Sequence, residues 1–298
     1  MPGTDQLTAL PGPLRSLMQA PGVNEVMIMG SGSVWVEGER GLRHAGSIPP
    51  DQVALAIEQI TRFSGRRVDM TSPIVDACLP DGSRACVVLP PVAVDGPTIC
   101  IRRFAGSVFP LSAFTDPATS RGLRSLVSSR RNIVVSGATS SGKTSLLASL
   151  AAHVPARERL VVIEDTTELR IDHPHVVRLQ TRPGTTEGIG RVTAQDLVRA
   201  SMRLRPDRLV VGEVRGGEVV DMLLALTSGH EGCMSTVHAR SAQDALERLA
   251  MLAMRDNPQF DPSTLRGLVA QAIDAVVHVE RDPNGLRRVA DVLQVRNG

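Results

Sequence analysis

The sequence predicts an α/β protein in which a smaller mixed domain precedes a larger domain built on a parallel sheet. From about residue 118 onward, short apolar runs alternate with segments of helical spacing, which is typical of parallel strands joined by crossover helices. Residues 13–105 instead combine several strand-like segments with one helical segment. Between them, residues 106–117 contain two prolines and predict a linker. We therefore expect domains at 13–105 and 118–298.

In the first domain, a loosely alternating pattern on either side of a Gly-Ser-Gly turn predicts a hairpin over residues 23–36. Apolar residues at helical spacing predict a helix over 50–64. A strand-rich segment follows over 75–104. Turn signals at 80–82 and 95–97 divide this segment into several strands.

In the second domain, apolar runs and helical spacing predict five strands, four helices and a terminal hairpin. The expected strands are 132–136, 160–164, 175–180, 209–213 and 232–237, and the expected helices are 143–152, 193–204, 216–228 and 241–255. Residues 276–279 and 287–295 flank Asp282-Pro283-Asn284-Gly285, a strong hairpin signal.

Bulk composition excludes several classes of protein. The net charge of +2 is too small to indicate a nucleic-acid or anionic-membrane partner, and five Phe, one Trp and no Tyr are too few for base stacking. The four cysteines form no C-x-x-C pair, so the sequence predicts neither a zinc clip nor a disulfide framework. It has no apolar stretch of about 18 residues, the length that spans a bilayer. We expect a cytoplasmic protein without a transmembrane segment.

The most specific motif contains the only lysine among the 33 Lys+Arg residues. A short apolar strand leads into a G-x4-G-K-[ST] sequence, and a helical segment follows. In such a loop the backbone N–H groups wrap a β-phosphate, Lys143 neutralises β- and γ-oxygens, and Thr144 binds Mg²⁺. The alternative is a chance match, which the flanking strand and helix disfavour. The motif predicts binding of ATP and Mg²⁺ by Gly137, Ala138, Thr139, Ser140, Ser141, Gly142, Lys143, Thr144 and Ser145.

Two further apolar strands end in acids, at Glu164 and Glu213, and such ends line the ligand crevice of an open parallel sheet. Most P-loop NTPases carry an Asp before the Glu of this strand, but here Gly212 takes that position. We interpret Glu164 as polarising the attacking water, and Glu213 as binding Mg²⁺, partly through water. Asp165 and Glu168 have a plainer interpretation as caps of the following turn.

Two histidines, His230 and His238, bracket the expected strand 232–237. A single histidine is more often structural than chemical, and that alternative stays open for each. Two histidines around a strand that points at the nucleotide crevice favour a role in sensing the γ-phosphate.

Together these blocks resemble the secretion ATPase superfamily of type II secretion, type IV secretion and type IV pilus assembly. Its hallmarks are a Walker A loop, an "Asp box", a Gly-Glu Walker B strand and a "His box". They occur here in that order at 137–145, 160–170, 209–215 and 229–239. Gly212 is typical of this group. The stretches at 75–84, 205–208 and 212–218 are similar to the tight-adherence (Flp) pilus branch.

The resemblance implies a PAS-like N-terminal domain, a RecA-like ATPase domain and a homo-hexamer that hydrolyses ATP to power pilus assembly or secretion. It implies a place at the inner face of the cell membrane, beside inner-membrane platform proteins. It also implies that arginines of the first domain reach the γ-phosphate, and Arg84 and Arg102 match those positions best. Alternatively, Arg84 and Arg103 merely solvate a sheet edge. Cys78 and Cys86 replace the polar or basic residues of relatives, which leaves the arginine set open.

Three rival hypotheses remain. A nucleic-acid motor is disfavoured by the near-neutral charge and the few aromatic residues, so we expect no direct nucleic-acid binding. A nucleotide-gated scaffold that binds ATP without hydrolysis is supported by the missing Walker B Asp. A conjugation-associated type IV secretion ATPase would differ in its partners and not in its ATP chemistry.

Overall fold

The computed structural model describes residues 10–38, 40–64, 68–103, 108–182, 184, 190–282 and 285–296. They belong to two compact units, residues 1–106 and 107–298. Residues 106 and 107 of the expected linker and Phe104, at the end of the expected strand-rich segment, lie outside the described residues. Within the described ranges, every helix is too short or too polar to cross a bilayer.

The first unit is an antiparallel sheet with two helices. Its elements are α1 (Gly12–Gln19), β1 (Val23–Ile28), β2 (Ser33–Gly38), β3 (Gly41–Ser47), α2 (Pro50–Ser64), β4 (Ile74–Cys78), β5 (Arg84–Val88) and β6 (Thr98–Arg102). The strands lie in the order β3-β2-β1-β6-β5-β4, and every neighbouring pair is antiparallel. The expected hairpin, helix and strand-rich segment are all present. α1 and β3 were not predicted.

Alternation of buried and more exposed positions in β2, β4, β5 and β6 explains why the sheet has one covered face. Val26 and Ile28 of β1 belong to a buried cluster with Leu14 of α1 and Ile60 of α2. The alternate positions of β4, β5 and β6 are half-buried or exposed. Arg84 and Arg102 lie on this second, more open face.

The second unit is a seven-stranded sheet between two helical layers, and its α/β class confirms the sequence prediction. The strands lie in the order β13-β12-β7-β11-β10-β8-β9, all parallel except the β12–β13 pair. The strands are β7 (Ile133–Gly137), β8 (Leu160–Glu164), β9 (Val176–Gln180), β10 (Arg208–Val211), β11 (Met234–His238), β12 (Ala275–Arg281) and β13 (Arg287–Gln294). The helices are η1 (Leu111–Ala113), α3 (Pro117–Ser128), α4 (Lys143–Ala151), α5 (Ala194–Ser201), η2 (Met202–Leu204), α6 (Glu218–Thr227), α7 (Ala242–Asp256) and α8 (Pro262–Ala272).

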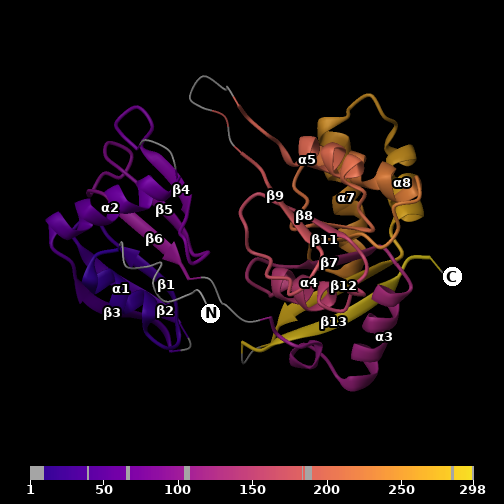
Figure 1. Cartoon of the computed structure of the whole chain (residues 1–298), viewed down its shortest axis with the longest axis horizontal. Coiled ribbons are helices and arrows are strands. Elements are labelled where there is room, and N and C mark those ends of the chain that lie inside the picture. Colours follow the sequence, from indigo (N-terminus) through magenta and orange to yellow (C-terminus); the bar gives the residue numbers. More distant parts are fainter. Residues whose placement is uncertain are drawn as a thin grey trace. The chain divides into compact units, whose positions relative to one another are not determined.

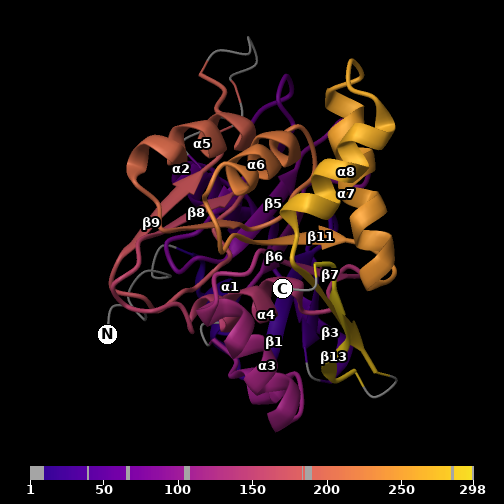
Figure 2. The ribbon, with the colours of Figure 1, turned by 90° about the vertical axis from the view of Figure 1, so that its right-hand side faces the viewer.

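The central strands β7, β8, β10, β11 and β12 are buried on both faces, which is why most of their residues are apolar. Ile133 and Val135 of β7 pack in a cluster with α3 and α4, whereas Val134 packs in the cluster of α5, α6, α7 and α8. In Figure 2, α5, α6 and α8 lie above β8 and β11, and α3 and α4 lie below them. The loops after the parallel strands therefore converge at one edge of the sheet, where ligands bind in such folds.

All five predicted strands and four predicted helices are present within a few residues of their expected bounds (Figure 1). The terminal hairpin also forms, as β12 and β13, although Pro283 and Asn284 of its turn lie outside the described residues. The prediction missed α3 and α8. Each begins at a proline whose preceding residue, Asp116 or Asp261, caps the helix with its carboxylate.

Candidate functional site

The loop between β7 and α4 has a backbone shape that requires glycine. Gly142, just before α4, has a φ of 106°, in the left-handed region where side chains are strained. At the other end, a Cβ on Gly137 would collide with the carbonyl oxygen of Val279. The loop therefore leads directly into the N-terminus of α4, where unpaired backbone N–H groups can bind phosphate.

The Lys143 ammonium is held inside this loop by three acceptors. Its Nζ donates to the carbonyl oxygens of Gly137 (3.1 Å) and Ala138 (2.8 Å) and to Nδ1 of His238 (3.1 Å). The residue is only 7 % exposed, and this burial is the main reason that its pKa is lowered. It forms no ion pair with any carboxylate of the described ranges. A buried, uncompensated cation suits the charge of a phosphate ligand.

His238 connects this lysine to the acid beyond β10. Its Nε2 lies 3.0 Å from Oε1 of Glu213. Burial, with a contribution from Lys143, lowers the pKa of His238, so the imidazole is neutral at pH 7. A neutral imidazole that accepts at Nδ1 carries its proton on Nε2, which then donates to Glu213. One hydrogen-bonded chain thus joins Lys143, His238 and Glu213.

Arg215 extends the chain and had no role in the sequence analysis. Its guanidinium lies 2.7 Å from Oε2 of Glu213 and 3.7 Å from Oδ2 of Asp165. Its backbone is fixed by Glu218, which accepts from its N–H, and by Arg255, which donates to its carbonyl oxygen. The sequence feature that could have indicated this role is the position of Arg215, two residues after Glu213.

Glu164 explains why residue 212 is glycine. A Cβ at position 212 would lie 2.9 Å from Cγ of Glu164, so the acid at the end of β8 fills the space that a Walker B Asp would need. Oε1 of Glu164 accepts from the N–H groups of Glu168 and Leu169, each at 2.8 Å. Burial raises the pKa of this carboxyl group. The turn is therefore capped by Glu164 itself, whereas Asp165 contacts Arg215 and Thr181.

Thr144 and Glu213 supply hydroxyl and carboxylate oxygens, the ligand types of a magnesium ion. Thr144 lies in the first turn of α4, beside Ser145, and its hydroxyl forms no hydrogen bond with other described residues. Hydroxyl and carboxylate oxygens are ligands that Mg²⁺ prefers, and it usually takes only one or two from the protein. The described ranges contain no cluster of three or more His, Cys, Asp or Glu that could hold a metal ion.

The structure does not bring His230 into this cluster, contrary to the sequence prediction. β11 runs parallel to β7, with Met234 opposite Ile133 and His238 opposite Gly137. His230 precedes β11 and so lies toward the edge where β7 begins, away from the phosphate loop. Only the histidine at the carboxyl end of β11 reaches the site, because parallel strands present one end each to the crevice.

Arg84 and Arg102 are direct neighbours across β5 and β6 in the first unit. The Arg102 side chain is 58 % exposed and lies 3.5 Å from the carboxylate of Glu25. Arg103 instead donates to the carbonyl oxygen of Ala20 at 2.9 Å, which is a contact within the first unit. Arg102 and Arg103 therefore have different partners, Glu25 and the backbone at Ala20, as expected for successive residues of an extended chain. The contact of Arg84 or Arg102 with a nucleotide stays a prediction.

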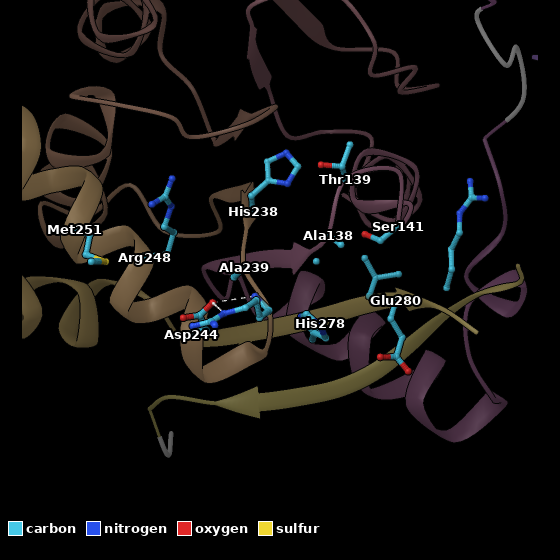
Figure 3. A pocket seen from close by; sticks show the side chains of 14 residues that line it. Ala138, Thr139, Ser141, His238, Ala239, Asp244, Arg248, Met251, His278 and Glu280 are labelled. Carbon is cyan, nitrogen blue, oxygen red and sulfur yellow. Dashed lines mark hydrogen bonds and ion pairs between the residues drawn. The ribbon is translucent and has the colours of Figure 1, made fainter. Parts of the chain in front are cut away.

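A cavity of about 870 Å³ opens beside the phosphate loop (Figure 3). It is lined by that loop, by His238 and the residues after it, by one side of α7, and by the end of β12. The sequence analysis missed His278 of β12, which is buried and lies 2.9 Å from the hydroxyl of Ser136 through Nδ1. β12 pairs with β7, which lies far away in the sequence. No local sequence pattern therefore predicts that His278 lies at this site.

Comparison with known proteins assigns the chain to a protein family. Residues 11–283 match the family described as type II/IV secretion system protein. The chain is a member of this family. As a secretion ATPase family member it has the RecA-like fold that the sequence resemblance implied, and the superfamily assignment is confirmed.

Two relatives and one solved structure illustrate the family. A Mycobacterium tuberculosis protein, named as a candidate conjugal transfer protein, is 38 % identical over 298 residues, covering 96 % of this chain and 84 % of the relative. The type IV secretion system protein PtlH of Bordetella pertussis is 37 % identical, covering 91 % and 89 %. The crystal structure of the Brucella suis VirB11 ATPase, in complex with sulphate, is 27 % identical with a TM-score of 0.53, covering 95 % and 92 %.

For this secretion ATPase family member we expect acid to reduce stability through His278. Burial is the main cause of its lowered pKa. A group with a lower pKa in the folded state binds a proton on unfolding, so its stabilising effect is lost as pH falls below the ordinary value of 6.5. Urea unfolding at pH 7.5 and 5.5 should show that native protein loses on the order of 1 kcal/mol more than His278→Asn. Equal losses in both proteins would contradict this role.

Proposed function

We propose that this chain is a motor ATPase that hydrolyses ATP to ADP and phosphate and so drives pilus assembly or secretion. The observation that carries the proposal is the hydrogen-bonded chain from Lys143 through His238 to Glu213. It places the Lys143 ammonium in a phosphate-binding loop. The imidazole of His238 bridges this ammonium and the carboxylate of Glu213. This is the pairing that phosphoryl transfer to water requires.

Binding of ATP would give Lys143 new partners. Its ammonium would exchange the bond to His238 for β- and γ-phosphate oxygens, which are stronger, charged acceptors. The freed Nδ1 would make the imidazole sensitive to the presence of a γ-phosphate. Mg²⁺, held by Thr144 and Glu213, would neutralise charge on the phosphate oxygens.

Glu164 is proposed to polarise the attacking water. It ends β8 at the ligand edge of the sheet, and its Oε2 forms no hydrogen bond with other described residues. Its raised pKa, caused by burial, suits a group that must accept a proton near neutral pH. The two N–H groups that bind Oε1 would hold the carboxylate in one orientation.

The remaining parts of the proposal concern assembly. Arg84 and Arg102 would contact the γ-phosphate, supported by their adjacency on the open face of their sheet. ATP would then favour a closed form, and hydrolysis would release it. We expect a homo-hexamer at the inner face of the membrane that acts on inner-membrane platform proteins. The domain boundaries at 105 and 118 belong to this proposal as well.

A second candidate is conjugation-associated type IV secretion. It is favoured by the conjugal transfer names of close relatives. Neighbouring reading frames separate the two candidates. Two polytopic membrane proteins and a small pilin would support tight-adherence pilus assembly, and a relaxase or coupling protein would support conjugation.

We expect the purified full-length chain to release phosphate from ATP only when Mg²⁺ is present. Chelation by EDTA should abolish release, and added Mg²⁺ should restore it, because the metal offsets phosphate charge. Light scattering in the presence of a non-hydrolysable ATP analogue should give six times the chain mass. Phosphate release that needs DNA would support the nucleic-acid motor. Nucleotide binding with no release from the hexamer would support the scaffold.

A further inference from the structure

The β12–β13 hairpin packs along the outer side of the phosphate loop. Nε of Arg281 donates to the carbonyl oxygen of Ser140 at 2.8 Å. A Cβ on Gly142 would lie 2.7 Å from Cδ of Arg287, so the stem of this second arginine rests against the end of the loop. Residues 281 and 287 are direct partners in the hairpin register. Two arginines from one hairpin thus contact the two ends of the three-residue stretch 140–142 of the loop.

Neither of these guanidinium groups has a carboxylate partner in the part of the chain that the structure describes. The same hairpin shows the contrast, because Arg288 lies 2.6 Å from the carboxylate of Glu280. Arg287 is half-buried, with its guanidinium 5.3 Å from the centre of the Phe109 ring. Burial and the neighbouring charge of Arg281 lower its pKa. Two adjacent cations without a counter-ion repel each other, and an anion between them would remove that cost.

The strand order tells which part of a nucleotide would supply the anion. β12 and β13 lie on one side of β7, whereas β11 and β10, which lead to His238 and Glu213, lie on the other. Because His238 and Glu213 are the groups proposed to respond to the γ-phosphate and to bind its Mg²⁺, they mark the opposite end of the phosphate chain. Arg281 and Arg287, on the other side of β7, would then face the phosphates that are not transferred.

We propose that Arg281 and Arg287 bind the non-transferred phosphates of the nucleotide from outside the phosphate loop. This inference rests on the proposed function, because it needs a nucleotide in the loop. It assigns to the ATPase unit two phosphate-binding arginines of its own, separate from Arg84 and Arg102 of the first unit. Because both ATP and ADP carry these phosphates, the pair contributes to affinity for either nucleotide and not to discrimination between them.

The test compares full-length Arg281→Gln/Arg287→Met with native protein and with Arg288→Gln as the matched control. Methionine retains the unbranched stem that packs against Gly142. Affinities for ATP and ADP, both with Mg²⁺, are measured by calorimetry at low and high salt. We expect the double variant to lose about tenfold or more for both nucleotides, and to lose part of the salt dependence. Arg288→Gln should bind like the native protein.

Several outcomes would overturn the inference. Affinities within twofold of native would show that the arginines do not contact the ligand. A loss confined to ATP would place them at the γ-phosphate. A loss with unchanged salt dependence and a lower melting temperature of the free protein would assign them a packing role only. In each case nucleotide binding by native protein and by Arg288→Gln would leave the proposed function standing, whereas no binding by either would remove both.

Discussion

Replacement of Lys143 by alanine is expected to abolish detectable nucleotide binding and hydrolysis. The ammonium is the one cation that the loop encloses, and it is satisfied in the free protein only by two carbonyl oxygens and His238. Charge-assisted hydrogen bonds contribute about 1.5–3 kcal/mol each, so losing those to two phosphates should weaken affinity at least ~100-fold. Calorimetric titration with ATP and Mg²⁺ measures this loss directly.

The folded state should tolerate this change. Burial lowers the pKa of Lys143, which means that enclosing the charged ammonium is unfavourable in the free protein. The melting temperature of Lys143→Ala should therefore stay close to that of the native chain. Lys143→Arg is the second variant, since a planar fork does not fit an enclosed site made for a primary amine. Native affinity in either variant would show that the loop is not the nucleotide site.

The sequence predicted the parts of this site that local patterns encode. A phosphate loop is a contiguous segment whose strand, glycines and helix all appear within about a dozen residues, so its position and its lysine could be identified directly. Glu164 and Glu213 were predicted because each ends an apolar strand, and His238 because it lies at the end of a strand that a second histidine precedes. Such strand ends meet at one edge whenever the sheet is parallel.

The parts that were missed depend on which strands become neighbours. His278 and Arg281 reach the phosphate loop only because β12 lies next to β7, and the two segments are about 140 residues apart in the sequence. The prediction placed His230 with His238, and the structure separates the two for a related reason. The prediction counted two histidines around one strand as equivalent, although the two ends of a parallel strand lie at opposite edges of the sheet.

Two helices that begin at a proline, α3 and α8, were not predicted. The Pro117 segment was interpreted as the end of a linker, but Asp116 accepts from the N–H groups of Ala118 and Thr119 and starts a helix there. Pro262 follows Asp261 in the same way at the start of α8. Proline at the first helical position loses no hydrogen bond, so an Asp-Pro pair before an amphipathic segment indicates a helix start as readily as a loop.

Replacement of Glu213 by glutamine is expected to separate ATP binding from hydrolysis. Glutamine keeps the shape of the side chain and can still accept from Arg215, but it lacks the charge that binds Mg²⁺ and supports attack by water. We expect ATP affinity within a few-fold of native and a turnover rate lower by about 10²–10⁴-fold. Glu280→Gln is the control, because Glu280 lines the same cavity but pairs with Arg288 on the hairpin.

Comparison with Glu164→Gln tests the division of labour between the two acids. Both variants should be slow if Glu164 polarises the water, but only Glu213→Gln should need more Mg²⁺ for half-maximal binding of ATP. Glutamine at 164 can still accept from the N–H groups of Glu168 and Leu169 through its oxygen, so the turn should remain folded. Rapid single-turnover hydrolysis by Glu164→Gln would show that this carboxylate only supports the turn. Native turnover by Glu213→Gln would show that hydrolysis does not depend on Mg²⁺ binding by Glu213.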